Sequence, residues 1–168
     1  MTATKEERPM KFRFPFQRSG AEEYLPVNEV RKTPPCSSSD GAMTDMGNNP
    51  YAFNSKRLGA SAENYRTALW TGKDLQLTLM NIAAGESGGD ELHENADRLI
   101  SVASGYGEVE ITTPHGERKI FSLSEGYSAI IPKGSAHTVR NTGNRPFVFF
   151  SVYTHPVYRF GTVDQMKS

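Results

Sequence analysis

The sequence lacks several features that mark common classes of protein. Its only cysteine is Cys36, which excludes an intrachain disulfide and suits a reducing compartment. Basic and acidic residues number 19 each, so the formal net charge is zero, and bulk charge gives no support to a nucleic-acid or membrane-surface role. No apolar run is long enough to span a membrane, and the N-terminus does not resemble a signal peptide. We therefore expect a cytoplasmic protein that binds neither nucleic acid nor membrane.

Residues 1–60 show little hydrophobic periodicity, because proline, glycine and serine interrupt them repeatedly. We expect an irregular or partly disordered N-terminal arm. Within it, Phe12, Phe14 and Phe16 alternate with other residues, and residues 24–30 are a second candidate for order. Two interpretations stay open: a disordered tail with apolar side chains, or an arm that adds to its own or a neighbour's sheet.

Residues 61–156 are organised differently, as short apolar stretches separated by turn signals. Leu75, Leu77 and Leu79 alternate with polar residues, which indicates a half-buried strand. About eight short strands without intervening helical patterns predict an all-β jelly roll or small barrel. The further strands are expected at residues 64–72, 98–103, 108–113, 118–123, 127–131, 137–141 and 146–154. Residues 157–168 are expected to form a C-terminal tail.

One stretch stands out by its spacing. Gly126, Pro132, Gly134, His137 and Asn141 follow the pattern G-x5-P-x-G-x2-H-x3-N. The proline and the second glycine predict a turn between two strands. The histidine at the start of the next strand is therefore held by a stiff corner, from which it can face a barrel mouth. This spacing resembles the second conserved motif of the cupin superfamily position for position.

The upstream stretch is similar to the first cupin motif, which is usually written G-x5-H-x-H-x3–4-E-x6-G. The matching positions here hold Gly85, Glu91, His93, Arg98 and Gly105. The spacing is kept, but two of the usual ligand types are not. Glu91 stands where the first histidine usually is, and Arg98 stands where the glutamate usually is.

Residues 64–165 look similar to small bacterial single-domain cupins that are often labelled mannose-6-phosphate isomerase-like. The resemblance implies a double-stranded β-helix, or jelly-roll, barrel that forms a homodimer and binds a small-molecule ligand at its wider end. It also implies that a divalent metal would be held by Glu91, His93 and His137. Arg98 would occupy the fourth position, where it cannot be a ligand, because guanidinium stays protonated and has no lone pair to give.

The residue types support two kinds of site. Glu91 and His93 are two apart, so on a strand they face the same side. Together with His137 they match ligand sets for Zn, Mn, Fe, Ni or Co. A guanidinium about 5 Å from a divalent ion would be repelled by about 6–7 kcal/mol at an effective dielectric near 20. The alternative is a site without metal, in which Arg98 pairs with Glu91 or with an anionic ligand.

Three functions therefore stay open. The first is a metal-dependent enzyme of isomerase, lyase or dioxygenase type, with Arg98 steering an anionic substrate. The second is a metal-free binding or sensing module, which Arg98 favours. The third is a structural or interaction protein that uses the N-terminal arm. The sequence assigns no reaction, because a fold does not carry one with it, and whether the chain is an enzyme stays open.

Overall fold

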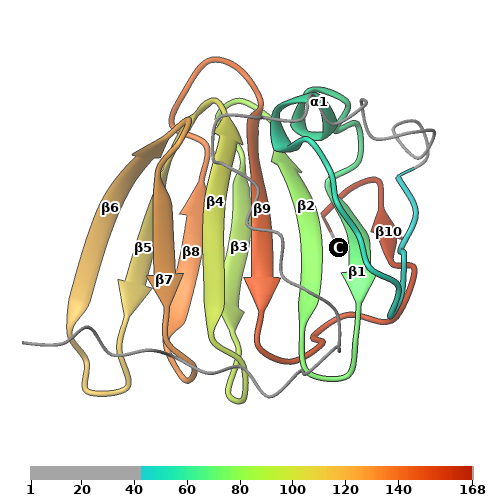
Figure 1. The fold of residues 1–168 in the computed structure, drawn as a ribbon. Coiled ribbons are helices and arrows are strands. Elements are labelled where there is room, and N and C mark those ends of the chain that lie inside the picture. The colour runs from blue at the N-terminus through green and yellow to red at the C-terminus, as the bar shows by residue number, and fades with distance from the viewer. Residues whose placement is uncertain (1–42, 168) are drawn as a thin grey trace, which may run out of the picture. The chain divides into compact units, whose positions relative to one another are not determined.

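The computed structural model describes residues 43–167, so the expectations for the phenylalanine-rich stretch and for residues 24–30 lie outside the described residues. Within them, the chain forms a short helix followed by ten strands (Figure 1). The elements are α1 (Ser55–Ala60), β1 (Arg66–Thr71), β2 (Gln76–Ile82), β3 (Ser87–Leu92), β4 (Arg98–Ser104), β5 (Tyr106–Thr112), β6 (Arg118–Ser124), β7 (Ser128–Ile131), β8 (Ala136–Arg140), β9 (Phe147–Tyr153) and β10 (Val163–Asp164). Across residues 43–167 no helix is both long and apolar enough to cross a membrane.

The strands form two antiparallel sheets. One has the order β10-β1-β2-β9-β4-β7, and the other has the order β3-β8-β5-β6. Strands that are distant in the sequence lie side by side, since β9 pairs with both β2 and β4 while β8 pairs with both β3 and β5. The main buried apolar cluster takes side chains from both sheets, so the sheets pack face to face. The predicted all-β jelly-roll fold is confirmed.

The space between the sheets has an apolar half and a polar half. Alternate residues of β9 face inward, and they read Phe147, Phe149, Ser151 and Tyr153 along the strand. The two phenylalanines belong to the main apolar cluster, where full burial of such a side chain contributes about 1.5–3 kcal/mol each. Ser151 and Tyr153 continue toward Arg98, the first residue of the neighbouring β4. The inward-facing side chains of β9 thus change along the strand from the packed apolar core to a polar site.

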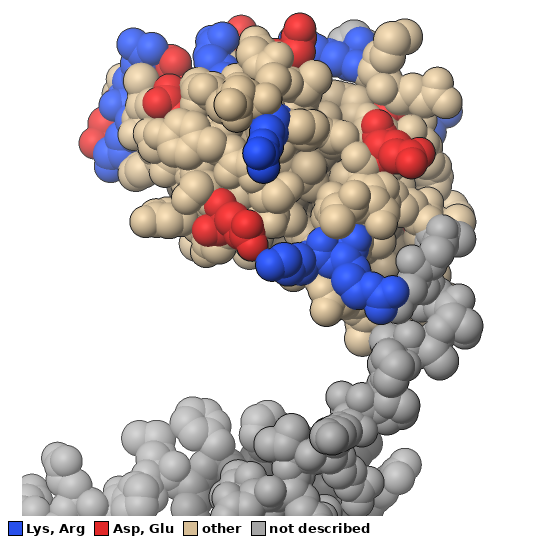
Figure 2. All heavy atoms as spheres, turned by 90° about the horizontal axis from the view of Figure 1, so that it is seen from above, with Lys and Arg blue, Asp and Glu red and all other residues tan. Residues whose placement is uncertain are grey.

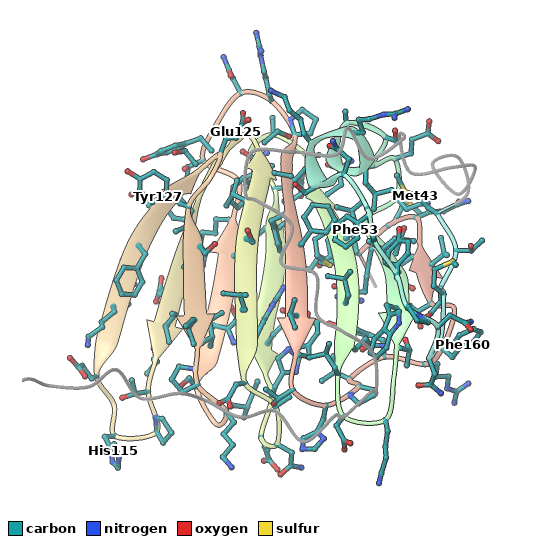
Figure 3. All side chains as sticks on the ribbon, in the orientation of Figure 1. Met43, Phe53, His115, Glu125, Tyr127 and Phe160 are labelled. Carbon is teal, nitrogen blue, oxygen red and sulfur yellow. The ribbon has the colours of Figure 1, made fainter. Side chains whose placement is uncertain are left out.

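A second apolar cluster lies on the outer side of the larger sheet. It is built on Leu69, Leu79, Val148 and Phe150 and is covered by side chains from residues 43–62. Phe53, labelled in Figure 3, packs against Phe150 with ring centroids 5.2 Å apart. The part of this sheet formed by β1, β2 and β9 is therefore covered on both faces, which explains why side chains on both faces of β2 are buried.

The corner before β8 adopts the turn that its sequence predicts. Gly134 has a φ of +74°, in the left-handed region that favours glycine. Its backbone N–H donates to the carbonyl of His93 at 2.9 Å. At the far end of β8, the Asn141 side chain donates to the carbonyls of Ile82 and Arg145 at 2.8 and 2.7 Å. These bonds fix the orientation of β8 and so of His137.

The C-terminal segment is bound to the barrel through a side chain of β2. The buried Gln76 amide donates to the carbonyl of Tyr158 at 2.9 Å and accepts from the N–H groups of Val157 and Tyr158 at 3.0 Å. Further on, Asp164 of β10 pairs in register with Arg66 of β1. Residues 157–164 therefore return to the polar half of the barrel.

Charged side chains are mixed on the face seen in Figure 2. Lysines and arginines lie there in small groups separated by acidic and uncharged residues. His115 lies at the tip of the β5–β6 hairpin, far along the barrel from the helix (Figure 3). The candidate site residues that the sequence predicted lie instead between the two sheets.

Candidate functional site

Four side chains that the sequence singled out meet at the polar half of the barrel. Glu91 on β3 lies directly opposite His137 on β8, and His93 follows the end of β3. The ligand atoms of these three residues all lie within 4.8 Å of one another. Arg98 reaches the same place from β4. The four side chains thus lie close together, as the sequence predicted. Their roles as metal ligands or as ligand-binding groups stay predictions.

Arg98 lies at the centre of this group and is only 1% exposed. Its Nη1 donates both to Glu91 Oε2 and to His137 Nε2, the latter at 2.9 Å. Its Nε and Nη2 donate to Ser151 Oγ at 3.2 and 3.0 Å. The ring of Tyr153 lies 5.2 Å from the guanidinium carbon, at a cation–π distance. The cation is thus held by hydrogen bonds to three strands other than its own.

The contact with Arg98 also fixes the tautomer of His137. Guanidinium has no acceptor, so His137 Nε2 must accept the hydrogen bond with its lone pair. The proton then lies on Nδ1, which donates to the Ser135 carbonyl at 3.2 Å. His137 is therefore a neutral imidazole whose metal-binding lone pair is already in use.

The Glu91 carboxylate is stabilised in its charged form. Burial alone would raise the pKa of Glu91, but the positive charges of Arg98 and Arg66 outweigh this, and the pKa lies far below its usual range. The two guanidiniums carry this effect, because Nε2 of His137 accepts from Arg98 and has no proton to give to Glu91. Burial meanwhile lowers the pKa of His93 to about 4, so His93 is neutral near pH 7.

A second group of residues, which the sequence did not identify, surrounds the other oxygen of Glu91. Tyr158 Oη donates to Glu91 Oε1 at 3.2 Å, and Arg66 Nη2 donates to the same oxygen at 3.3 Å. Arg66 Nη1 donates to Asp164 Oδ2 at 2.8 Å, while the Tyr158 ring lies 4.0 Å from the Arg66 guanidinium carbon. Burial raises the pKa of Tyr158, so its hydroxyl keeps its proton and can donate.

The same geometry tests whether the site fits a metal ion. Glu91, His93 and His137 could hold one, because their ligand atoms converge and His93 Nε2 is buried without a hydrogen-bond partner among the described residues. However, Arg98 already uses the lone pairs of Glu91 Oε2 and His137 Nε2. Glu91 keeps further carboxylate lone pairs, but the single lone pair of His137 Nε2 cannot serve both Arg98 and a metal ion. The three residues together therefore fit a divalent ion only if the guanidinium leaves.

Comparisons with known proteins bear on both the fold and the motifs. A family described as Cupin domain matches residues 78–153. The uncharacterized protein YrkC of Bacillus subtilis is 35% identical over 130 residues, which cover 75% of this chain and 68% of that protein. The crystal structure of BH2720 from Bacillus halodurans matches with a TM-score of 0.70 and 38% identity, covering 74% of this chain and 95% of that one.

A more distant similarity is to an enzyme. The glucose-6-phosphate isomerase of Thermococcus litoralis is 30% identical over 76 residues, which are 44% of this chain and 40% of the enzyme. The matched region thus spans less than half of that enzyme's length.

Proposed function

Because the chain belongs to the cupin family, we propose that it is a small-molecule-binding cupin whose site works without a metal ion. The Arg98 guanidinium is its resident cation. One observation carries this proposal: a single nitrogen of Arg98 donates to both Glu91 and His137. These are the groups that would otherwise ligate the metal.

The burial of Arg98 supports its permanence in the site. Its Nε, both hydrogens of Nη1 and one hydrogen of Nη2 are engaged. Moving the guanidinium aside would leave it without these partners inside the barrel, and it would leave Glu91 with one cation fewer. Uncompensated buried charge is costly, about 3–5 kcal/mol when one partner of a buried pair is removed. A metal ion would have to offset that cost as well as the mutual repulsion.

A divalent metal held by Glu91, His93 and His137 is the second candidate. The unpartnered Nε2 of His93 favours it, and Zn, Mn, Fe, Ni or Co suits two imidazoles and a carboxylate. When bound, such an ion would act as a Lewis acid or activate water. The small-molecule ligand, the homodimer and the cytoplasmic location remain predictions, and we assign no reaction.

Elemental analysis distinguishes the two candidates. Wild-type protein, Arg98→Gln and Arg98→Glu would be purified without a metal-affinity column, and their bound metals would be measured. We expect wild type to be essentially metal-free. Arg98→Glu places a carboxylate where the first cupin motif usually has one, so it should bind about one ion per chain. Arg98→Gln, which removes the cation without adding a ligand, should bind metal more weakly than Arg98→Glu.

Two results define the outcome. Stoichiometric metal in wild type would overturn the proposal and establish the second candidate. Metal in Arg98→Glu should disappear on the further change His137→Gln, which removes one ligand. Circular dichroism spectra with and without added Zn²⁺ would show whether each variant is folded, so that absence of metal is not confused with unfolding.

A further inference from the structure

Arg66 is a second buried guanidinium of the polar half, and its hydrogen-bonding capacity is only partly used. The residue is 8% exposed. Its Nε is buried without a hydrogen-bond partner among the described residues. Its bond to Glu91 Oε1 is long, at 3.3 Å, whereas its bond to Asp164 Oδ2 is 2.8 Å. A buried donor left unsatisfied is costly, so this guanidinium is suited to a further acceptor.

Asp164 is the more accessible partner of Arg66. It belongs to β10, a strand of two residues at the edge of the larger sheet. Its side chain is 34% exposed, against 10% for the side chain of Arg66. The carboxylate of Asp164 therefore lies between the buried cation and solvent. An anion that approaches Arg66 from this edge meets Asp164 first.

The balance of charge makes Asp164 the group that an anion would replace. Arg66 and Arg98 are the cations of this cluster, and Glu91 and Asp164 are their carboxylates. Glu91 is shared by both guanidiniums, so its displacement would also leave the buried Arg98 without a counter-ion. Without Asp164, the cluster would carry one excess positive charge at low dielectric, where an opposite charge is strongly attracted.

The rest of the C-terminal segment is held independently of this ion pair. Gln76 binds the backbone of Tyr158. Further along this segment, Gly161 N–H donates to Asp45 Oδ2 at 3.0 Å. The Tyr158 ring against the guanidinium gives Arg66 a fixed flat surface. Asp164 can thus exchange its partner while the segment stays in place.

From this arrangement we propose that Arg66 is the anion-binding residue of this buried cluster, and that Asp164 occupies the position of the ligand's acidic group when no ligand is bound. The ligand class is a small organic molecule with a carboxylate or phosphate group, which guanidinium binds through charge-assisted hydrogen bonds. This inference rests on the proposed function, in which guanidinium groups rather than a metal ion supply the positive charge of the site.

Titration with acetate and with inorganic phosphate, followed by the NMR shifts of backbone amides at constant ionic strength, tests the proposal. Asp164→Asn should bind one of the two probes about tenfold more tightly than wild type, because the competing carboxylate is neutralised. The preferred probe then indicates the acidic group of the natural ligand. Asp74→Asn is the matched control, since it removes the same charge at an exposed turn, and its affinity should equal that of wild type.

The double variant Asp164→Asn/Arg66→Gln should lose the gain. Equal affinity of Asp164→Asn and wild type for both probes would overturn the inference, and so would a gain that persists in the double variant. If Asp164→Asn does not fold, Asp164→Ser replaces it with the same expectations. Metal content is measured on the same samples. Metal in wild type would refute the proposed function and with it the premise of this inference, whereas failure to gain anion binding in metal-free protein would refute this inference alone.

Discussion

The charge on Glu91 should contribute strongly to stability, and the variant Glu91→Gln tests this. The side chain is 17% exposed, while its partner Arg98 is 1% exposed, so the change leaves a buried guanidinium without its main counter-ion. Removing one partner of a buried pair costs about 3–5 kcal/mol. The glutamine amide can still accept from Arg98, so we expect a loss near the lower end. For a chain of this length that corresponds to a fall in Tm of about 6–12 °C.

Denaturant unfolding of four proteins measures the effect: wild type, Glu91→Gln, Arg98→Met and the double variant. The double variant should lose less stability than the sum of the single ones, with a coupling energy of about 2–3 kcal/mol, because neither charge is then left alone. Glu110→Gln is the control. It breaks the exposed Arg118–Glu110 pair, whose N–O distance is 2.6 Å, and its unfolding midpoint should not change measurably.

Two results would refute the reasoning. A loss in Glu91→Gln no larger than that in Glu110→Gln would mean that the site is solvated in solution. Additive losses in the double variant would mean that Glu91 and Arg98 do not act as a pair.

Two further predictions concern a turn and a histidine. Gly105 and Gly116 have similar φ angles of +86° and +83°, but a Cβ at Gly105 would lie 2.4 Å from the Pro146 carbonyl oxygen, whereas one at Gly116 meets nothing within 4 Å. Gly105→Ala should therefore cost at least about 2 kcal/mol more than Gly116→Ala in denaturant unfolding. The pKa of His93 falls from 6.5 to about 4 on burial, so as pH drops the unfolded state takes up the proton first. Stability should thus decline between those two pH values, and His93→Gln should reduce that decline; an unchanged pH dependence would contradict it.

The sequence predicted the parts of the site that depend on local spacing. Pro132 and Gly134 define a turn with few alternatives, and the two-residue offset of Glu91 and His93 puts them on one side. Strand alternation also predicted most of the barrel. By contrast, β3 was not expected as a strand, because Gly88 and Gly89 make its stretch look like a loop. It nevertheless pairs with β8, with a register shift between Ser87 and Asp90 where the two glycines lie.

The remaining site residues could not be predicted, because their contacts are long-range. Tyr158 and Asp164 reach the site because Gln76 binds the backbone of the C-terminal segment and because β10 pairs with β1. Backbone bonds of this kind leave no trace in the side chains of that segment. Arg66 lay in a predicted strand without a motif around it. For Arg98 the motif predicted a place in the site but not a partner. A metal site with Arg98 turned away and a metal-free site with Arg98 paired to Glu91 differ only in the direction of one long side chain.

The hydrogen bonds of Arg98 also have a consequence for how the barrel opens. From β4 this residue holds β9 in its own sheet, and β3 and β8 in the facing sheet. In a chain with a single cysteine, it acts as a non-covalent cross-link between segments far apart in the sequence. The sheets cannot separate at this end without breaking it. Amide protons around the site should therefore exchange with solvent only through global unfolding, and any ligand has to enter past the barrel rim rather than between the sheets.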